Sequence, residues 1–468
     1  MRLLGVAAAA VLGQALVRFA GTAFRYLASP YSRDYGEGCV LMMVQLLHER
    51  GTYFVDLRDY PFVHGNYPPL FIALVWPFFA AFGPSLLAPR ALSLLATLGL
   101  VAVVYVFARR LASSRTAGAA FAALVLAPWF VQSWAPMGRV DMWACLLSIA
   151  GLLAAARGSL SIAFPLFWLG FFTKQSALVA PAAVLLHVMI EGPPRRFLRA
   201  LAGFALPLAV LFGALVIATH GEAYRHLVPY TAAAEYEWAR MAVSYLELAQ
   251  AAWPLLLLVA VSFAAARGGP PAGSDGPGGP ARLVFIYWLA SLASLVTIAK
   301  AGAAQNYFIE PWLATLLAAA AAWRARWTLR HPALRPAILF VAAAAAHYTN
   351  LDGHRPPGLI RHPERARDFE ELWTILKTTR GPVLSENLAA LVVNGQPVLV
   401  EPFGMLLLSQ KGLFDPARLV RDCEAGKFAL IVAEHRFERF PGLAACLETR
   451  YQPTQDLSTY RLFRPRLP

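Results

Sequence analysis

Long apolar stretches recur from the N-terminus to about residue 350, separated by short breaks that are rich in arginine, proline or glycine. Hydrophobic residues make up 58% of the 468 residues and charged residues only 15%, which is more apolar surface than one soluble core can bury. The stretches run about 15 to 24 residues, the length with which an α-helix crosses a bilayer. We therefore expect a polytopic α-helical membrane protein.

The hydropathy pattern predicts about eleven membrane-spanning helices within residues 1–350. The expected spans are residues 3–24, 86–108, 117–136, 140–156, 159–173, 176–192, 197–219, 247–266, 283–300, 306–323 and 334–348. The first stretch has no clear cleavage site, so we interpret it as a span and not as a removed signal. The stretch 68–83 is short and opens with two prolines, which predicts a re-entrant or interfacial helix on the outer side.

Arginine predicts the orientation of the spans. Arg109 and Arg110 lie in one break and Arg195 and Arg196 in another, and two further breaks are similar. Because short cytoplasmic loops are enriched in Lys and Arg, we place these breaks and the N-terminus in the cytoplasm. The loop 25–67 then faces outward. Lipid headgroups explain the net charge of +14 better than a nucleic acid does, since the arginines lie in these short loops.

The sequence changes character after about residue 350. Short apolar runs at 382–384, 397–400 and 428–432 alternate there with amphipathic helical stretches. This alternation predicts a small soluble α/β domain over residues 351–468, placed outside by the same count of spans. Cys423 and Cys446 both lie in it, and they either pair in an oxidising compartment or remain free thiols.

Cations stand out among the polar residues at the predicted outer ends of the spans. Arg139, Lys174 and Lys300 run against the positive-inside bias, and an anionic ligand such as a phosphate would explain them. Only five lysines occur in the chain, and the two in the membrane part are both at outer ends. Charged side chains near hydrocarbon are costly, so this collection predicts a functional site. The alternative is that each residue snorkels separately to the membrane surface.

Two carboxylates, Asp34 and Glu37, lie three residues apart just after the first span. On a short helix they would share a face. Transfer of a sugar to a hydroxyl needs a carboxylate to take the acceptor's proton, and a departing lipid phosphate needs cations to hold its charge. Asp34 could be that base, and Glu37 could orient the acceptor or bind a metal. The simpler interpretation is an Asp34 that caps a helix and a solvated Glu37.

Five short motifs follow one another along the membrane part: Asp34-Tyr35-Gly36-Glu37-Gly38, Tyr67-Pro68-Pro69-Leu70, Arg139-Val140-Asp141, Thr173-Lys174-Gln175 and Asn306-Tyr307-Phe308-Ile309-Glu310-Pro311. In this order they resemble the motifs of bacterial glycosyltransferase family 39-like proteins of the GT-C superfamily, which are related to protein O-mannosyltransferases and lipid A aminoarabinose transferases. The resemblance covers residues 1 to about 320 and does not extend well into the C-terminal domain.

The resemblance implies an inverting transferase of the GT-C type in the bacterial inner membrane. Its donor would be a polyprenyl-phosphate-linked sugar, and its acceptor would be a glycan, lipid or protein outside the cytoplasm. Asp34 is implied as the general base, with Glu37 beside it, while Arg139, Lys174 and Lys300 would face the donor phosphate. The residues implied to line the site are His64, Tyr67, Asp141, Gln175, Asn306, Tyr307 and Glu310.

Departures from the family pattern leave the sugar and the acceptor open. Two residues separate Asp34 and Glu37, where protein mannosyltransferases have a paired Asp-Glu, and Tyr67 stands where the aminoarabinose enzymes have a lysine. A divalent metal is also left open. His64, His220 and His226 could bind one together with Glu37 or Glu222, although their spacing gives no support.

Two other classes of protein would also suit parts of this pattern. A transporter or flippase of lipid-linked or anionic substrates would have many helices and a charged cluster, but we see no internal repeat and no acidic residue in the middle of a predicted span. A membrane scaffold whose soluble domain binds a partner is the third class. A scaffold of this kind predicts that replacing Asp34 leaves the protein's function unchanged.

Overall fold

The computed structural model describes residues 2–265, 279–325, 328, 330–349 and 363–466, and it divides into two compact units. The helical unit comprises Met1–Ala28, Arg90–Leu211 and Glu235–Pro356. The mixed unit comprises Ser29–Pro89, Phe212–Ala234 and Pro357–Pro468. A helical membrane protein with a small C-terminal α/β part was predicted, and this fold class is confirmed. The predicted module of residues 1–350 is nevertheless not one compact unit, because two of its segments fold with the C-terminal residues.

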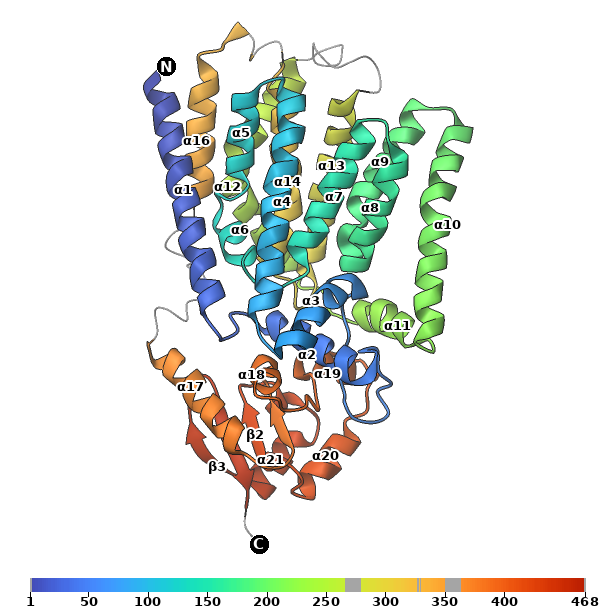
Figure 1. Ribbon diagram of the computed structural model, residues 1–468, viewed down its shortest axis with the longest axis vertical. Helices are drawn as coiled ribbons and strands as arrows, with labels where there is room; N and C mark the ends of the chain where they lie inside the picture. The colour runs from blue at the N-terminus through green and yellow to red at the C-terminus, as the bar shows by residue number, and fades with distance from the viewer. Residues whose placement is uncertain (1, 266–278, 326–327, 329, 350–362, 467–468) are drawn as a thin grey trace. The chain divides into compact units, whose positions relative to one another are not determined.

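The helical unit consists of helices that run roughly parallel to one another (Figure 1). They are α1 (Arg2–Ala28), α4 (Leu87–Ala112), α5 (Arg115–Leu124), α6 (Trp129–Trp134), α7 (Asp141–Ala156), α8 (Leu160–Thr173), η1 (Gln175–Leu178), α9 (Val179–Glu191), α10 (Pro194–Ala218), α12 (Trp238–Ala265), α13 (Pro280–Ser294), η3 (Leu295–Ala299), η4 (Gln305–Phe308), α14 (Ile309–Ala322) and α16 (Leu334–Tyr348). Helix α1 packs against α16, and α7 against α8.

Among the described residues, five helices are long and apolar enough to cross a membrane: α1, α4, α10, α12, and α13 continued by η3. All five coincide with predicted spans. The other predicted spans are shorter helices or are broken. Residues 117–136, for example, form α5 and α6 with a break between them, because Pro128 disfavours helix in the residue before it. The total of about eleven crossings stays a prediction.

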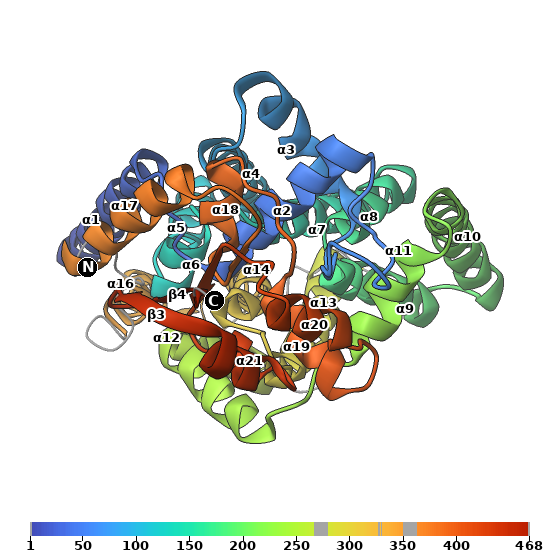
Figure 2. The ribbon, with the colours of Figure 1, turned by 90° about the horizontal axis from the view of Figure 1, so that it is seen from below.

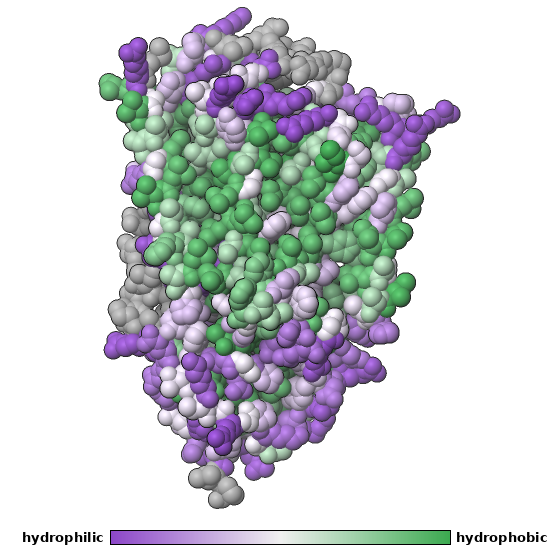
Figure 3. Space-filling model, in the orientation of Figure 1, coloured by the Kyte–Doolittle hydropathy of each residue, from purple (hydrophilic) through white to green (hydrophobic). Residues whose placement is uncertain are grey.

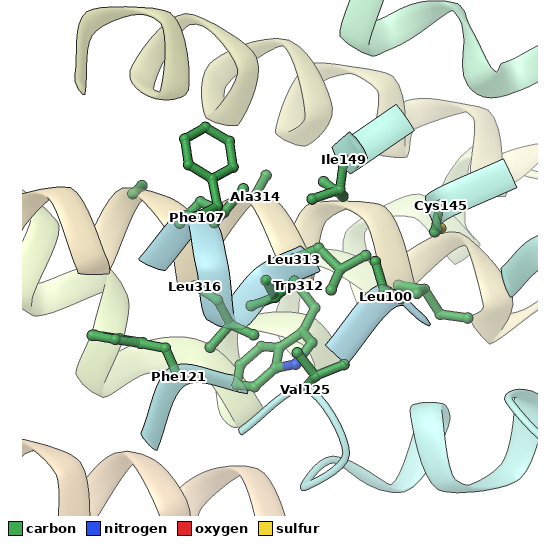
Figure 4. Close-up of a cluster of buried hydrophobic side chains, with 14 of the residues drawn as sticks. Leu100, Phe107, Phe121, Val125, Cys145, Ile149, Trp312, Leu313, Ala314 and Leu316 are labelled. Carbon is green, nitrogen blue, oxygen red and sulfur yellow. The ribbon is translucent and has the colours of Figure 1, made fainter. Parts of the chain in front are cut away.

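Helix α14 is the centre of the helical unit. All its residues except Glu310 are buried, and a helix that is apolar on every side belongs inside a bundle. Its Trp312 is fully buried, and the indole N–H donates to the carbonyl of Leu124 (3.2 Å). Figure 4 shows the ring among side chains of α4, α5 and α14. By contrast, α10 lies at the edge of the unit, with only Ala200 and Phe204 buried (Figure 2).

The surface of the helical unit is apolar where lipid would contact it. On the face shown in Figure 3, hydrophobic residues cover the middle of the bundle, and hydrophilic residues gather at the end that carries the N-terminus. Exposed large apolar side chains on α10 include Leu206 (65%) and Val210 (70%). A soluble protein rarely exposes such a continuous patch, so the distribution agrees with an integral membrane protein.

The mixed unit contains a four-stranded sheet of order β1-β2-β4-β3, in which β1 and β2 are parallel and the other pairs are antiparallel. Its elements are α2 (Tyr35–Arg50), α3 (Pro69–Phe82), α11 (Glu222–Arg225), the π-helix η2 (His226–Tyr230), α17 (Pro363–Thr378), β1 (Val383–Ser385), α18 (Leu388–Val393), α19 (Pro402–Gln410), α20 (Ala417–Glu424), β2 (Leu430–Ala433), η5 (Phe437–Arg439), α21 (Leu443–Arg450), β3 (Tyr451–Asp456) and β4 (Arg461–Pro465). The predicted segment 68–83 forms helix α3, and its position at a membrane surface stays a prediction.

The first loop shares its core with the C-terminal residues. Phe62 is buried in the same cluster as Val400 and Phe414, and its backbone exchanges hydrogen bonds with Leu399 and Glu401 (both 2.8 Å). The C-terminal part is also cross-linked, because Cys423 in α20 and Cys446 in α21 form a disulfide. Of the two alternatives for these cysteines, the structure therefore has the pair.

Helix α2 packs closely on α18, and Gly38 is the point of contact. A Cβ atom at Gly38 would lie 2.9 Å from the backbone nitrogen of Ala389 and 3.0 Å from the Cβ of Leu388. Backbone atoms cannot move aside as a flexible side chain can. The second glycine of Asp34-Tyr35-Gly36-Glu37-Gly38 thus has a packing reason, since any larger residue would push the two helices apart.

We expect Gly38→Ala to destabilise the mixed unit by about 1–3 kcal/mol, the usual cost of overpacking a filled interface. Cys39 is a buried cysteine of the same helix that forms no disulfide, and Cys145 is a second such cysteine in the helical unit. Both proteins would carry Cys145→Ser, so that Cys39 is the cysteine that reports. The temperature at which Cys39 reacts with a thiol-specific dye should be lower in Gly38→Ala than in the protein with Gly38. Gly13→Ala is the matched control because a Cβ at Gly13 meets nothing within 4 Å, and we expect a change within about 0.5 kcal/mol. Equal shifts in both variants would contradict this account.

Candidate functional site

Three helix ends in the helical unit bring a carboxylate and two cations together. Asp141 opens α7, Lys174 follows α8, and Asn306 lies in η4 just before α14. The Lys174 ammonium donates to Asp141 Oδ1 (2.7 Å), and Asn306 Nδ2 donates to the same oxygen (2.8 Å). Arg139 Nε lies 3.4 Å from Asp141 Oδ2. We call these four residues and Tyr307 the cation cluster.

Aromatic rings hold both cations of the cluster. The Lys174 ammonium lies 4.5 Å from the centre of the Tyr307 ring, and the Arg139 guanidinium lies 5.0 Å from the Trp134 ring. The side chains of Lys174 and Arg139 are only 13% and 12% exposed. With one carboxylate for two cations, the cluster carries one net positive charge. Positive charge that is shielded from water suits an anionic ligand, because screening by solvent is weak there.

The other predicted residues of the helical unit lie near the same helix ends. Glu310 is in the first turn of α14 and accepts a hydrogen bond from the Tyr287 hydroxyl (3.1 Å). Gln175 begins η1. Lys300 lies in the loop between η3 and η4, where its backbone forms an isolated bridge with Tyr236. The contact of Lys300 with a donor phosphate stays a prediction.

In the mixed unit, Asp34 caps helix α2. Its Oδ2 accepts from the backbone N–H of Gly36 (2.8 Å), and its backbone is extended, as expected of a capping residue. Glu37, one turn on, is fully buried and accepts from the backbone N–H of Arg33 (2.8 Å). Asp34 therefore has the capping role of the simpler interpretation, but a solvated Glu37 is wrong, because α2 packs with its first turn inside the unit.

A pocket of about 220 Å³ opens in the mixed unit beside Asp34. We call it the Asp34 pocket. It is lined by Ser32, Arg33, Asp34, Tyr35, Gly38, Phe369, Glu386, Asn387, Leu388, Ala389, Glu434, Arg436, Thr459 and Tyr460. More than half of these residues come from the C-terminal domain. Glu37, by contrast, does not line the pocket, so of the two predicted catalytic carboxylates only Asp34 can meet a molecule bound there.

Tyr35 ties the wall of the pocket to helix α19. Its hydroxyl donates to the buried carboxylate of Glu401, which also accepts from the backbone N–H groups of Phe403 (3.1 Å) and Gly404 (2.8 Å). Burial raises the pKa of Glu401 and of the Tyr35 hydroxyl. The Arg436 guanidinium lies over the Tyr35 ring, 4.9 Å from its centre. The residue after Asp34 is therefore held by charged groups more than 360 residues away in the chain.

Glu386 and Arg436 also line the pocket and contact each other. Glu386 is buried and accepts from the backbone N–H groups of Arg436 (2.7 Å) and Phe437 (2.8 Å). The Arg436 guanidinium contacts Glu386 (3.2 Å) and Glu434 (2.8 Å). Ligand atoms of Glu386, Glu434 and His435 lie within 4.8 Å of one another, which would suit a metal ion. However, Arg436 already supplies positive charge to both carboxylates.

Two of the histidines suggested as metal ligands, His64 and His226, are stacked on each other with ring centres 5.8 Å apart. His226 Nδ1 accepts from the backbone N–H of Gly65 (2.9 Å), and Nε2 donates to the carbonyl of Val55 (2.8 Å). His226 thus has no lone pair left for a metal and instead holds the first loop. His64 Nε2 donates to the carbonyl of His226 (3.0 Å). Tyr67, another predicted lining residue, is buried, and its backbone carbonyl accepts from the Tyr53 hydroxyl (2.8 Å).

We expect His226 to make the mixed unit sensitive to acid. Burial lowers its pKa from 6.5 to about 4. The unfolded chain therefore binds a proton at a higher pH than the folded one, and stability is lost as the pH falls from about 6.5 to about 4. The full loss is on the order of 3 kcal/mol. Cys39 labelling at pH 7 and pH 4.5 should show this loss in the wild type and a smaller one in His226→Gln. The exposed His435→Gln is the control and should behave as the wild type.

Several residues of the Asp34 pocket were not predicted as site residues from the sequence: Glu386, Asn387, Glu434, Arg436 and Tyr460. A signal for four of them was present. Glu386 and Asn387 directly follow β1, and Glu434 and Arg436 follow β2, which both coincide with apolar runs visible in the sequence. Because the two strands are parallel, their carboxyl ends meet at one edge of the sheet, which is where α/β sheets bind ligands.

The chain was compared with families, curated proteins and solved structures. No family model and no curated protein matches it. Among solved structures it is similar to ArnT from Cupriavidus metallidurans bound to undecaprenyl phosphate, with a TM-score of 0.60, 14% sequence identity and coverage of 97% of each chain. It is also similar to the apo state of the same protein, with a TM-score of 0.61, 14% identity, and coverage of 97% of this chain and 98% of that one. The predicted resemblance in fold to lipid A aminoarabinose transferases is confirmed.

Proposed function

We propose that this integral membrane protein is a glycosyltransferase that moves a sugar from a polyprenyl-phosphate-linked donor to an acceptor outside the cytoplasm. The observation that carries the proposal is the similarity in fold, over nearly the whole of both chains, to an enzyme structure bound to undecaprenyl phosphate. The two polar sites agree with it chemically. The cation cluster suits the phosphate of the donor, and the Asp34 pocket offers a carboxylate that can take up a proton.

The proposed reaction is a single displacement with inversion at the anomeric carbon. Asp34 accepts the proton of an acceptor hydroxyl, the hydroxyl oxygen forms a bond to the anomeric carbon, and the bond from that carbon to the phosphate oxygen breaks. The electron pair leaves on the polyprenyl phosphate. Arg139 and Lys174 stabilise the negative charge that develops on this leaving group, because preorganised cations act most strongly on charge that forms in the transition state.

Two features of the mixed unit support its location outside the cytoplasm. Its three chain segments share one core, so they must lie on the same side of a membrane. The predicted spans agree, since six lie between the first and second segments and four between the second and third, and even numbers return the chain to the same side. The disulfide between Cys423 and Cys446 favours an oxidising compartment. With one span before the unit, the N-terminus would be cytoplasmic.

Release of polyprenyl phosphate tests the proposal. The purified protein in lipid nanodiscs would receive radiolabelled polyprenyl-phosphate-mannose or polyprenyl-phosphate-glucose together with crude envelope acceptors, and the free lipid phosphate would be measured. We expect release above that of heat-inactivated protein with one donor, and more of it when acceptors are present. No release with any donor would overturn the proposal, and a transporter would then explain the cation cluster better.

A further inference from the structure

The Asp34 pocket has the composition of a sugar-binding site. Aromatic and polar groups both line its walls: Tyr460 and Phe369 lie edge to face with ring centres 6.2 Å apart, and Asn387 Nδ2 donates to the Tyr460 hydroxyl (3.2 Å). Planar polar groups, such as the Glu434 carboxylate and the Arg436 guanidinium, can each bind two neighbouring hydroxyls. Aromatic faces pack on the apolar faces of sugar rings.

The size of the pocket limits what it can hold. Its volume is about 220 Å³. Pockets for drug-sized molecules measure about 300–1,000 Å³. A single sugar ring is therefore a better match than a lipid chain or a folded peptide.

The charge of the pocket excludes a phosphate as the preferred occupant. Its walls carry three carboxylates, Asp34, Glu386 and Glu434, against two cations, Arg33 and Arg436. Arg436 is already paired with two of these carboxylates. The net charge is therefore negative by one unit, which repels an anion, and this is the opposite of the cation cluster in the helical unit. A neutral hydroxyl-bearing ring meets no such penalty.

We propose that the Asp34 pocket binds one neutral sugar ring of the acceptor, and that Asp34 in its wall takes the proton from the hydroxyl that receives the transferred sugar. The acceptor would then be a glycan or a glycolipid and not an unglycosylated protein. This inference rests on the proposed transfer reaction. The sugar of the donor has the same chemistry, so the experiment must separate the two sources.

Saturation-transfer NMR of the full-length protein in nanodiscs tests the pocket without any turnover. The probes are methyl α-D-glucopyranoside, methyl α-D-mannopyranoside, and the negatively charged methyl α-D-glucuronide. We expect at least one neutral glycoside to bind and the glucuronide to bind more weakly. Absence of binding by both neutral glycosides, or tighter binding of the glucuronide, would overturn the proposal.

Variants locate the binding in the pocket. Glu434 is an exposed side chain in the pocket wall, and Glu434→Gln should weaken binding of the neutral glycoside about tenfold, the effect of losing one charge-assisted hydrogen bond. Tyr460→Phe keeps the ring, removes only the hydroxyl and should also weaken binding. Glu438→Gln makes the same chemical change as Glu434→Gln at an exposed residue outside the pocket lining, and it should bind as the wild type does. Unchanged affinity in both pocket variants would contradict the proposal.

Addition of the donor separates the two sources of sugar. The NMR experiment would be repeated with a saturating amount of the polyprenyl-phosphate sugar that supports release. If the pocket belongs to the acceptor, the glycoside signals persist beside the donor. If they disappear, the donor's own sugar occupies the pocket and the acceptor assignment is wrong. Should no donor support release, the proposed function fails, whereas the experiment without donor still decides whether the pocket binds sugar.

Discussion

Asp34→Asn is expected to lower the rate of polyprenyl phosphate release by about 10²–10⁴-fold while the protein remains folded. An amide cannot accept the proton of the acceptor hydroxyl, so the general base is lost. The substitution is well matched to the structure because Asn caps helices as well as Asp does. The oxygen of the amide can still accept from the backbone N–H of Gly36, the hydrogen bond that Asp34 makes now. The release assay in nanodiscs measures the effect.

Two comparisons make this result specific. Asp415→Asn removes another carboxylate of the mixed unit that accepts from a backbone N–H, that of Ala417 (2.9 Å), and it should leave the rate unchanged. Heating curves of Cys39 labelling should agree between Asp34→Asn and the wild type. A variant that releases polyprenyl phosphate at the wild-type rate would remove Asp34 as the base and favour a purely structural role as a helix cap.

Asp141→Asn should be the most destabilising single change in the cation cluster. The substitution leaves the cations of Lys174 and Arg139 without their shared carboxylate, and breaking a buried ion pair costs about 3–5 kcal/mol. The Asp141 side chain is only 5% exposed, so water does little to compensate. Cys145 lies one turn further along the same helix and is a buried free thiol. Its labelling during denaturant titration, in a Cys39→Ser background, reports the loss.

A double-mutant cycle separates the ion pair from general damage. Lys174→Gln should also destabilise, but the double variant Asp141→Asn/Lys174→Gln should lose clearly less than the two single variants together. Additive losses would mean that the two side chains do not act as a pair. If the Lys174 ammonium binds the donor phosphate, Lys174→Gln should raise the donor concentration that gives the half-maximal rate in the release assay. A purely structural lysine would leave this concentration unchanged.

Locally encoded features were predicted well from the sequence. The five long helices and the apolar runs that become β1 and β2 depend on neighbouring residues, and hydropathy and periodicity report on those directly. The break at Pro128 inside the predicted span 117–136 was not predicted. The order of the motifs also predicted that Arg139, Lys174 and Asn306 belong to one site. The sequence alone did not predict that Asp141, expected only as a lining residue, is the carboxylate that both cations contact.

Which chain segments fold together in the mixed unit could not be predicted in the same way. Nothing near Phe62 indicates that it pairs with Val400, or that Gly65 donates to His226, because these contacts join residues separated by more than 160 positions. The first loop therefore looked like a connection within the membrane module. Its position in a common core with the C-terminal residues follows only from packing in three dimensions.

The discontinuous core of the mixed unit has a consequence for the order of events during synthesis. Helix α2, which carries Asp34 at its start, is made early, but α18 and α19, on which it packs, lie beyond residue 380. At about 5–20 residues per second, the ribosome needs roughly 15 to 50 seconds to make residues 90–356 before the third segment can follow. During this interval Gly38 and Phe62 have no covering partner from the C-terminal residues. The nascent protein would therefore remain inactive until its last quarter has been translated, and chains that terminate early would expose an apolar surface that quality-control proteases can recognise.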